Sequence, residues 1–512
     1  MKYNILFGGE AGQGPNILTH LLAEVLVEQG FYVFYARDYQ SLIRGGHNFN
    51  VLTFSEKPVF SNDKELDLII ALDKNTVKIH GQNLKKEGLI LEGKHPNMYF
   101  AGRLFKVLGM DFKLLDRKLK ELEHKYKENI VEAKKGYDEA EAHLDLPTVN
   151  KSHRSVYPKE GQDPKLRSAG ARQFYSGSQG IAKGAIASGI DIYYAYPMTP
   201  ATPVLGELAA KQKDENILVL ELENEIAVAS AGVGSSITGA KTMVGTSGGG
   251  FDLMGETLSM AGIAGAPLVF YLAQRTGPGT GVATYNTQGD LNIARHSGHG
   301  EFERVVLAPG DSLESIELIN QAFYLSQKFG VPSIIISDKH CAESFFTVDK
   351  KEKITKSGKW TKFGRYNSYE KNSEGSATED PKTVVQNVQE RMNNWKVLEK
   401  ETEKFEGYKV YGKKNSNNCV VFWGSTKGAV LDAISGLDIC AIQVLHISPF
   451  PLKVEKLLKG KNLILVENNS SGQLGDLIRE KTGLEIKKKV LKYDGRPFLC
   501  DELRKELGRV LR

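Results

Sequence analysis

Short apolar runs alternate with amphipathic segments along most of the chain, and this pattern predicts an α/β protein. The first run, residues 3–7, leads into a glycine loop at 8–14, and residues 16–29 then carry leucine and valine at helical spacing. A second strand is predicted at 32–36, and the apolar run 66–72 predicts a buried parallel strand. Strand, glycine loop, helix and parallel strand together are typical of a βαβ unit.

Two polar stretches divide the chain into three regions of this kind. Residues 111–143 interleave Lys and Glu at helical spacing, which predicts one solvated helix that closes the first domain. The predicted organisation is therefore a first α/β domain (1–145), a linker (146–171), a central doubly wound domain (172–348), a charged connection with one helix (349–416) and a smaller α/β domain (417–512).

Length and charge agree with this division and exclude several classes of protein. A chain of 512 residues fits about three or four domains of roughly 150 residues. The net charge of +5 is spread over the whole chain, which argues against a nucleic-acid or membrane-surface protein. Apolar runs such as 266–273 are far shorter than the roughly 20 residues of a membrane span, and the start of the chain lacks a signal-peptide cleavage site. We expect a soluble, cytoplasmic protein.

The cysteines are few and scattered. Without any CxxC spacing, they predict neither a disulfide framework nor an iron–sulfur cluster held by this chain alone. We expect them to be small buried hydrophobic residues, and they are Cys341, Cys419, Cys440 and Cys500.

Two glycine-containing loops in the first domain could contact a ligand. The loop at 8–14 either holds a phosphate or nucleotide with its backbone amides or forms a tight structural turn. In residues 41–47, Arg44 either meets an anionic ligand or belongs to an exposed turn.

Chemistry-bearing side chains in the central domain follow predicted strands. The proline-rich elbow 196–203 places Thr199 at a helix start, where it either holds a small carboxylate or caps its own helix. Three carboxylates lie within 221–225, and each is either functional or a helix cap. Arg275 faces the same sheet edge, whereas the role of His299 in a glycine turn stays open.

These motifs, taken in order, resemble one enzyme family. The segments YPMTP (196–200), ELENEIAVASAGVGSSITGAK (221–241), TSGGGFDLM (246–254), LAQRTGPGTG (272–281), TQGDL (287–291) and GHGEF (298–302) resemble the α subunit of 2-oxoacid:ferredoxin oxidoreductases. The loops GGEAGQG and IRGGHN resemble the γ domain of these enzymes, fused in front as in the 2-oxoglutarate branch. The resemblance implies a γ domain, a pyrimidine-type thiamine diphosphate domain and a transketolase C-terminal-like domain, all built on doubly wound open sheets.

The resemblance also assigns a role to Glu225. In the family, a carboxyl group hydrogen-bonded to the aminopyrimidine of thiamine diphosphate favours the imino tautomer. Glu225 fits this position better than Glu223, because its spacing to Gly234, Gly239 and Lys241 matches the family's helix.

Substrate and cofactor residues follow from the same comparison of motifs. Thr199 and Arg275 match the residues that hold the carboxylate of the 2-oxoacid, and Tyr196 lies beside them in the elbow. Arg44 falls where the family has a basic residue of the γ domain near the substrate. The expected cofactor-binding turn comprises Ser247, Gly248 and Gly249.

The chain lacks the family's magnesium motif. Gly289-Asp290-Leu291 has no third glycine, and Asn320 lies within a predicted helix. Mg²⁺ and a [4Fe-4S] cluster are therefore expected on a separate β subunit of an α2β2 heterotetramer. The resemblance implies oxidation of a 2-oxoacid, with coenzyme A as co-substrate and ferredoxin as electron acceptor. Two alternatives stay open at this point, a thiamine-dependent transferase of the transketolase type and a non-catalytic nucleotide-binding scaffold.

Overall fold

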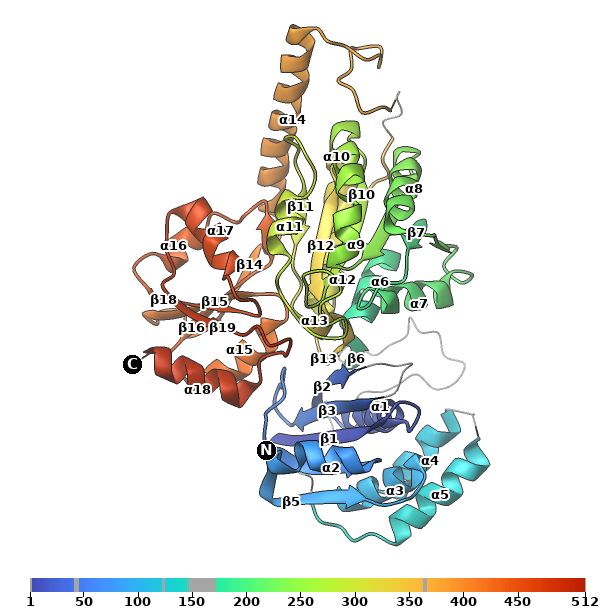
Figure 1. Cartoon of the computed structure of the whole chain (residues 1–512). Coiled ribbons are helices and arrows are strands. Elements are labelled where there is room, and N and C mark those ends of the chain that lie inside the picture. The colour runs from blue at the N-terminus through green and yellow to red at the C-terminus, as the bar shows by residue number, and fades with distance from the viewer. Residues whose placement is uncertain are drawn as a thin grey trace. The chain divides into compact units, whose positions relative to one another are not determined.

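The computed structural model of the protein describes residues 2–40, 46–121, 125–144, 146, 172–361 and 366–511 (Figure 1). These residues form two compact units, and each unit is described by itself below. The first unit comprises Met1–Tyr175, Ser344–Lys351 and Leu499–Leu503, and the second comprises Ser176–Glu343, Glu352–Phe498 and Arg504–Arg512. Three open sheets run through the described residues, which confirms the predicted α/β class. The five predicted domain ranges stay a prediction.

The first unit is built on a mixed sheet in the order β5-β4-β1-β3-β2-β13-β6. Its strands are β1 (Lys2–Glu10), β2 (Tyr32–Tyr39), β3 (His47–Ser55), β4 (Leu66–Ala71), β5 (Leu84–Glu92), β6 (Gln173–Ser176) and β13 (Phe345–Val348). Helix α1 (Pro15–Glu28) connects β1 to β2 along the chain and buries Leu22 and Leu26 against the sheet. Strand β4 pairs parallel with β1, which confirms the βαβ unit. Strand β3 pairs antiparallel with both β1 and β2, and it makes the sheet mixed.

The solvated helix expected over 111–143 is two helices instead. They are α4 (Phe112–Glu121) and α5 (Tyr126–Asp138), and both pack near α3 (Asn97–Val107). Lys125, the residue before α5, has φ 52°, in the left-handed region. A right-handed helix cannot continue through that conformation, so the charged stretch is divided. The remaining short helices of this unit are α2 (Lys74–His80) and the 3-10 turn η1 (Gly81–Asn83).

The second unit contains the central sheet, in the order β17-β11-β12-β10-β9-β7-β8. Its strands are β7 (Ile192–Ala195), β8 (Leu218–Glu221), β9 (Thr242–Thr246), β10 (Leu268–Gln274), β11 (Val305–Leu307), β12 (Ser333–Asp338) and β17 (His446–Ser448). Neighbouring strands from β8 to β11 are parallel, and only β17 is added antiparallel.

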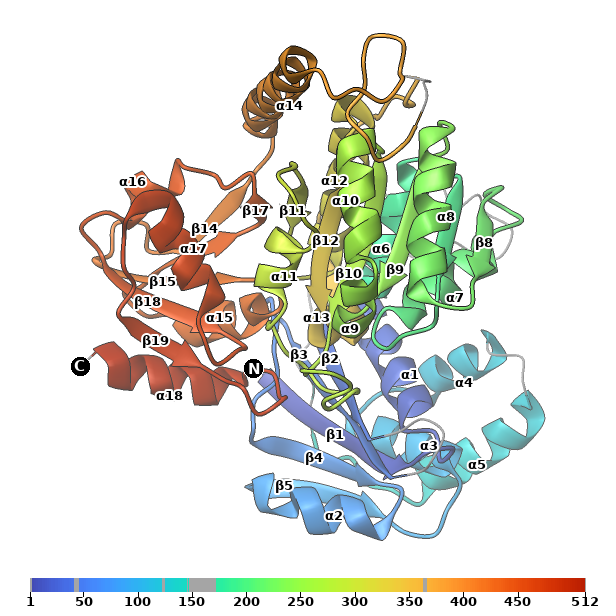
Figure 2. The same ribbon diagram turned by 45° about the horizontal axis from the view of Figure 1, so that its top comes forward.

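Helices cover both faces of this central sheet (Figure 2). Tyr193 and Tyr271 pack on the face of α6 (Gly177–Ala187), α7 (Thr202–Lys211) and α12 (Ser312–Phe329). Val244 and Phe270 pack on the face of α8 (Glu225–Ile237), α9 (Gly248–Leu253) and α10 (Gly255–Ala264). The sheet is therefore doubly wound, as the sequence predicted. Two short helices, α11 (Leu291–His296) and α13 (Lys339–Glu343), follow β10 and β12.

A third, smaller sheet completes the second unit, in the order β14-β16-β15-β18-β19. Its strands are β14 (Tyr408–Gly412), β15 (Asn418–Trp423), β16 (Cys440–Val444), β18 (Asn462–Glu467) and β19 (Lys488–Leu491). The accompanying helices are α15 (Thr426–Ile434), α16 (Val454–Leu458) and α17 (Gln473–Thr482). The last helix, α18 (Cys500–Leu511), has its first residues in the first unit and the rest in the second. The long helix α14 (Pro381–Thr402) lies in the charged connection, as predicted. No helix of the described residues is long and apolar enough to cross a membrane.

The cysteines are free thiols. Cys341, Cys419 and Cys440 are buried, as expected, whereas Cys500 is only half-buried.

Candidate active site

The order of the central strands marks one edge of the sheet as the place for a ligand. The chain passes from β7 outward to β8, whereas from β9 it passes the other way to β10. The loops after two neighbouring parallel strands, β7 and β9, therefore lead in opposite directions. In open α/β sheets, such a switch point opens a crevice at the carboxyl ends of the strands. The predicted motifs YPMTP and TSGGG follow these two strands.

Glu225 lies in the first turn of α8, with its side chain turned into the protein. Only 3% of it is exposed, and its Oε1 has no hydrogen-bond partner among the described residues. The helix cap is the neighbour Asn224, whose Oδ1 accepts from the amide of Ala227 at 2.9 Å. Glu225 is thus not needed as a cap, and its carboxyl group is available for a ligand. Glu223, by contrast, is exposed.

Arg275 is brought to the elbow that carries Thr199. A guanidinium nitrogen of Arg275 donates to the backbone carbonyl of Thr199 at 3.0 Å. Burial lowers the pKa of Arg275, and the nearby charge of Glu225 opposes that shift. Thr199, Arg275 and Glu225 therefore converge from three separate strand ends. Thr199 lies three residues before α7, whose cap is Ala201 without a side-chain hydrogen bond, so the capping role considered for Thr199 is not observed.

The turn Ser247–Gly250 lies between two buried carboxyl groups. Ser247 is fully buried, and its Oγ has no partner among the described residues. A Cβ placed on Gly250 would lie 2.5 Å from Oε1 of Glu225, and one on Gly248 would lie 2.5 Å from Oδ2 of Asp290. Nothing lies within 4 Å of a Cβ placed on Gly249. The backbone is therefore tightly enclosed on two sides and open at Gly249.

Asp290 is a member of this site that the sequence motifs did not predict, because it lies in an incomplete metal motif. Its Oδ2 is buried and has no partner in the described part of the chain. Burial, with a smaller contribution from Asp252, raises the pKa of Asp290 to about 6. The sequence signal that could have found it is its place just before α11, on the loop that begins at Arg275.

The other predicted residues are less tightly placed. Tyr196 is 41% exposed at the end of β7. Arg44 lies outside the described residues, so its predicted role stays a prediction. His47, in the same motif, has its Nε2 at 2.9 Å from Nε2 of His80 within the first unit, and burial is the main reason why the pKa of both imidazoles is lowered.

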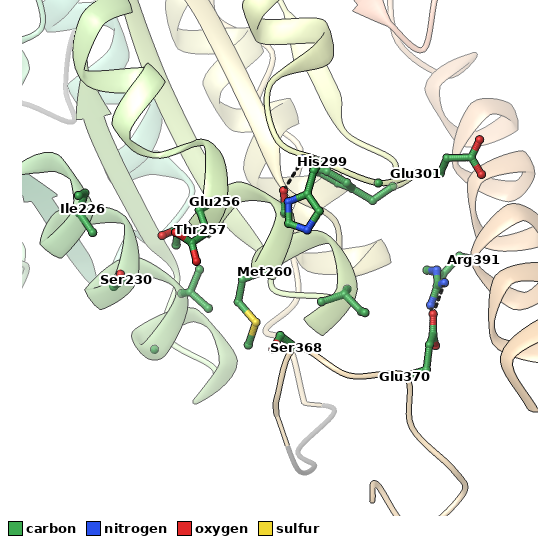
Figure 3. Close-up of a pocket in the computed structure, with 16 residues that line it drawn as sticks. Ile226, Ser230, Glu256, Thr257, Met260, His299, Glu301, Ser368, Glu370 and Arg391 are labelled. Atoms are coloured by element: carbon green, nitrogen blue, oxygen red, sulfur yellow. Dashed lines mark hydrogen bonds and ion pairs between the residues drawn. The ribbon is translucent and has the colours of Figure 1, made fainter. Parts of the chain in front are cut away.

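A cavity of about 900 Å³ lies beside this site, between α8, α10 and the GHGEF loop (Figure 3). Ile226, Glu256, Met260 and His299 line it, and the ion pair between Arg391 and Glu370 forms its far wall. The predicted catalytic and substrate residues are absent from its lining within the described chain. The cavity therefore adjoins the first turn of α8 without containing Glu225. No cluster of three or more His, Cys, Asp or Glu suited to a metal ion occurs in the residues described.

A doubly wound sheet with a buried carboxyl group at its switch point suits a thiamine diphosphate domain, and the family comparison agrees. Residues 183–414 match the family model "Pyruvate flavodoxin/ferredoxin oxidoreductase, thiamine diP-bdg", and residues 4–131 match "Pyruvate ferredoxin/flavodoxin oxidoreductase". The chain belongs to the family of 2-oxoacid:ferredoxin oxidoreductase α subunits, a family of oxidoreductases. This membership confirms the resemblance and replaces the transferase and scaffold alternatives.

Individual relatives extend this assignment over the whole chain. The 2-oxoacid:ferredoxin oxidoreductase subunit alpha of Sulfolobus sp is 28% identical, and the alignment covers 100% of this chain and 97% of the relative. The 2-oxoglutarate synthase subunit KorA of Methanocaldococcus jannaschii is 30% identical over 58% of this chain and 88% of its own length. The solved 2-oxoglutarate:ferredoxin oxidoreductase of Magnetococcus marinus, with 2-oxoglutarate, coenzyme A and succinyl-CoA bound, shares the fold with a TM-score of 0.86, at 22% identity and 100% coverage of both chains.

Proposed function

We propose that this chain is the α subunit, with a fused γ domain, of an enzyme that oxidises 2-oxoglutarate. The reaction converts the 2-oxoacid and coenzyme A to an acyl-CoA and CO2, and two electrons leave one at a time to ferredoxin. The observation that carries the proposal is the buried Oε1 of Glu225, which lacks a partner among the described residues beside the Arg275–Thr199 contact. Relatives named 2-oxoglutarate synthase support the choice of substrate.

The residues at the switch point fit the aminopyrimidine of thiamine diphosphate. A carboxyl group with an unsatisfied oxygen suits the far ring nitrogen, and the open backbone at Gly249 leaves room beside it. When bound, thiamine diphosphate supplies an electron sink for the carbonyl carbon of the 2-oxoacid. Glu225 would hold a proton at Oε1. Water is largely excluded from this side chain, because only 3% of Glu225 is exposed.

Arg275 would bind the carboxylate of the 2-oxoacid. Its guanidinium is half-buried, and its contact with the carbonyl of Thr199 uses one nitrogen, which leaves further donors for an anion. Burial strengthens such a charge-assisted contact, because less water competes for the guanidinium. Thr199 and Tyr196 would form the wall of the substrate site from the elbow after β7.

The diphosphate, Mg²⁺ and the [4Fe-4S] cluster would belong to a β subunit in an α2β2 assembly. Such a subunit has to reach the surface next to Glu225. Two apolar side chains there are exposed, Ile226 by 52% and Leu253 by 49%. Together with the neighbouring cavity they form the surface on which we place the β subunit. Ile226→Asp should prevent co-purification of the β subunit, whereas Val131→Asp, an exposed apolar control in the first unit, should not.

The role of Glu225 is tested by exchange of the C2 proton of thiamine diphosphate bound to the assembled enzyme. Glu225→Gln should lower the exchange rate by about 10²-fold or more, the range of a lost acid–base catalyst, while the subunits stay associated. The matched control is Glu223→Gln, which changes an exposed carboxylate two positions away and should exchange like the unmodified enzyme. Equal rates in the two variants would remove the proposed role of Glu225.

The substrate is tested by steady-state rates on a panel of 2-oxoacids. We expect the highest kcat/KM for 2-oxoglutarate and a strict requirement for coenzyme A. A higher kcat/KM for pyruvate or for a branched-chain 2-oxoacid would refute the choice of substrate and leave the reaction class intact.

A further inference from the structure

The loop that follows Arg275 is held by the third sheet of the second unit. Residues 276–290 lead from the end of β10 to α11, and they meet the turn Glu467–Asn469 at the end of β18. This contact joins residues that are 182 positions apart, on two different sheets of one compact unit.

Asn468 is the centre of this contact. It is 1% exposed, and its Oδ1 accepts from Nδ2 of Asn286 at 2.6 Å. Its backbone amide donates to Oε1 of Gln288 at 2.8 Å, and its carbonyl accepts from the amide of Gln288 at 2.8 Å. Its own Nδ2 donates to the carbonyls of Lys492 at 2.7 Å and Arg496 at 3.1 Å. The side chain thus connects the loop to a second segment of the C-terminal domain.

The loop 276–290 also forms hydrogen bonds with the side chains of Gln274 and Thr276, the two neighbours of Arg275 in the chain. Oγ1 of Thr276 donates to the carbonyl of Asn286 at 3.0 Å. Oε1 of Gln274 accepts from the amide of Asp290 at 2.9 Å. The side chains on each side of Arg275 are therefore bonded to the loop, at Asn286, which contacts Asn468, and at Asp290, and the guanidinium is left to reach Thr199.

We infer that Asn468 is a positioning residue for substrate binding, which acts through the loop 276–290 on Arg275. The C-terminal domain would then contribute to recognition of the 2-oxoacid carboxylate without contacting it. This inference rests on the proposed role of Arg275. A guanidinium binds a carboxylate well only within a narrow range of positions, so a loosened loop weakens substrate binding more than it weakens the fold.

The test compares variants of the assembled enzyme with its β subunit. Asn468→Ala should raise KM for the 2-oxoacid by about tenfold. A displacement of a binding group by about 1 Å can cause a loss of this size or larger. KM for coenzyme A and the C2 exchange rate of bound thiamine diphosphate should stay unchanged. The control is Asn462→Ala at the start of β18, where Nδ2 donates to Oδ1 of Asn418 at 2.8 Å, so that an asparagine hydrogen bond is lost far from the loop. It should leave KM for the 2-oxoacid unchanged.

A double-mutant comparison decides whether Asn468 acts through Arg275. Adding Asn468→Ala to Arg275→Ala should give no further rise in KM, since the residue to be positioned is already gone. A further tenfold rise would overturn the inference. If Asn468→Ala does not assemble, Asn286→Ala removes the same hydrogen bond from the loop side and has the same expected result.

The outcomes separate this inference from the proposed function. A raised KM in Arg275→Ala together with an unchanged KM in Asn468→Ala overturns the positioning role alone. An unchanged KM in Arg275→Ala overturns the carboxylate role of Arg275, and with it the positioning role. A loss of C2 exchange in Asn468→Ala would show that the effect is not confined to the substrate side, and this also overturns the inference.

Discussion

A single methyl group added at Gly250 should displace the carboxyl group of Glu225. The new Cβ would overlap Oγ1 of Thr246 and lie 2.5 Å from Oε1 of Glu225. An ordinary carbon–oxygen contact needs about 3.3 Å or more, so the carboxyl group must move by roughly 1 Å. Thr246 and Glu225 are both buried, and they have little room to move. Overpacking of this kind costs about 1–3 kcal/mol.

Gly249→Ala is the matched control, because the same change is made one residue earlier in the same helix. Nothing lies within 4 Å of a Cβ at this position. Replacing glycine by alanine in a helix is worth up to about 1 kcal/mol, so this variant should be as stable as the unmodified chain or more stable. If Gly249→Ala keeps its stability but binds thiamine diphosphate more weakly, the empty space beside residue 249 is the space that the cofactor occupies.

The assay has two readouts, urea unfolding and C2 exchange of bound thiamine diphosphate. Gly250→Ala should lose stability by the amount given above and should also exchange more slowly, by about 10-fold or more, since a shift of about 1 Å misplaces the carboxyl group that we propose as the acid–base catalyst. If Gly250→Ala were as stable as Gly249→Ala in urea unfolding, the close contact between residue 250 and Glu225 would be refuted.

Three further changes test the electrostatics and packing. Because the pKa of Asp290 is raised from 3.8 to about 6, the folded state binds its proton more tightly, and the free energy of unfolding falls as pH rises from about 4 to 6. Asp290→Asn should remove this pH dependence and raise the free energy of unfolding by up to about 3 kcal/mol above pH 6. Parallel pH profiles of urea unfolding for the two proteins would contradict this. Lys427 is buried and pairs with Glu314 at 2.6 Å, so Lys427→Met should cost about 3–5 kcal/mol in urea unfolding. The exposed pair Lys453–Glu403 supplies the control, because Lys453→Met should cost less than about 1 kcal/mol, and equal costs would refute the effect of burial. A Cβ on Gly102 would overlap the carbonyl of Ala133 where α3 crosses α5, so Gly102→Ala should lower the melting temperature of the first unit, whereas Gly81→Ala, whose Cβ meets only Val77 at 3.6 Å, should not.

The sequence predicted the doubly wound arrangement of the central sheet because strands such as β9, β10 and β12 are short apolar runs bounded by glycine or polar residues. Strands β11 and β17 of the same sheet are only three residues long and were not predicted. It predicted Glu225 through a motif, and the structure adds the reason why this carboxyl group differs from Glu223. Asn224 caps the helix, so Glu225 falls in the first turn and is buried while Glu223 is exposed.

Contacts between distant segments could not be predicted in the same way. Strand β13 pairs with β2, where Phe345 lies opposite Tyr35. The sequence of a strand of only four residues does not indicate which strand it pairs with. Strand β3 also escaped prediction, although it pairs with two neighbours along its length. The contact between Asn468 and Asn286 depends on how two sheets pack against each other. Neither residue is part of the periodic pattern of apolar positions from which helices and strands are predicted.

Glu225 and Arg275 affect each other beyond their separate roles. Burial lowers the pKa of Arg275, and the negative charge of Glu225 opposes this shift, so Glu225 helps to keep the guanidinium charged in a partly dry site. A substrate carboxylate at Arg275 would meet repulsion from an ionised Glu225, and this repulsion would be relieved once Glu225 holds its proton at Oε1. The Glu225→Gln variant therefore separates two effects of the same side chain. It should lose proton exchange, yet bind the 2-oxoacid at least as tightly as the unmodified enzyme, because the neutral amide removes the competing negative charge. A raised KM in this variant would mean that Glu225 holds Arg275 in place, and that charge balance within the pair matters less than its geometry.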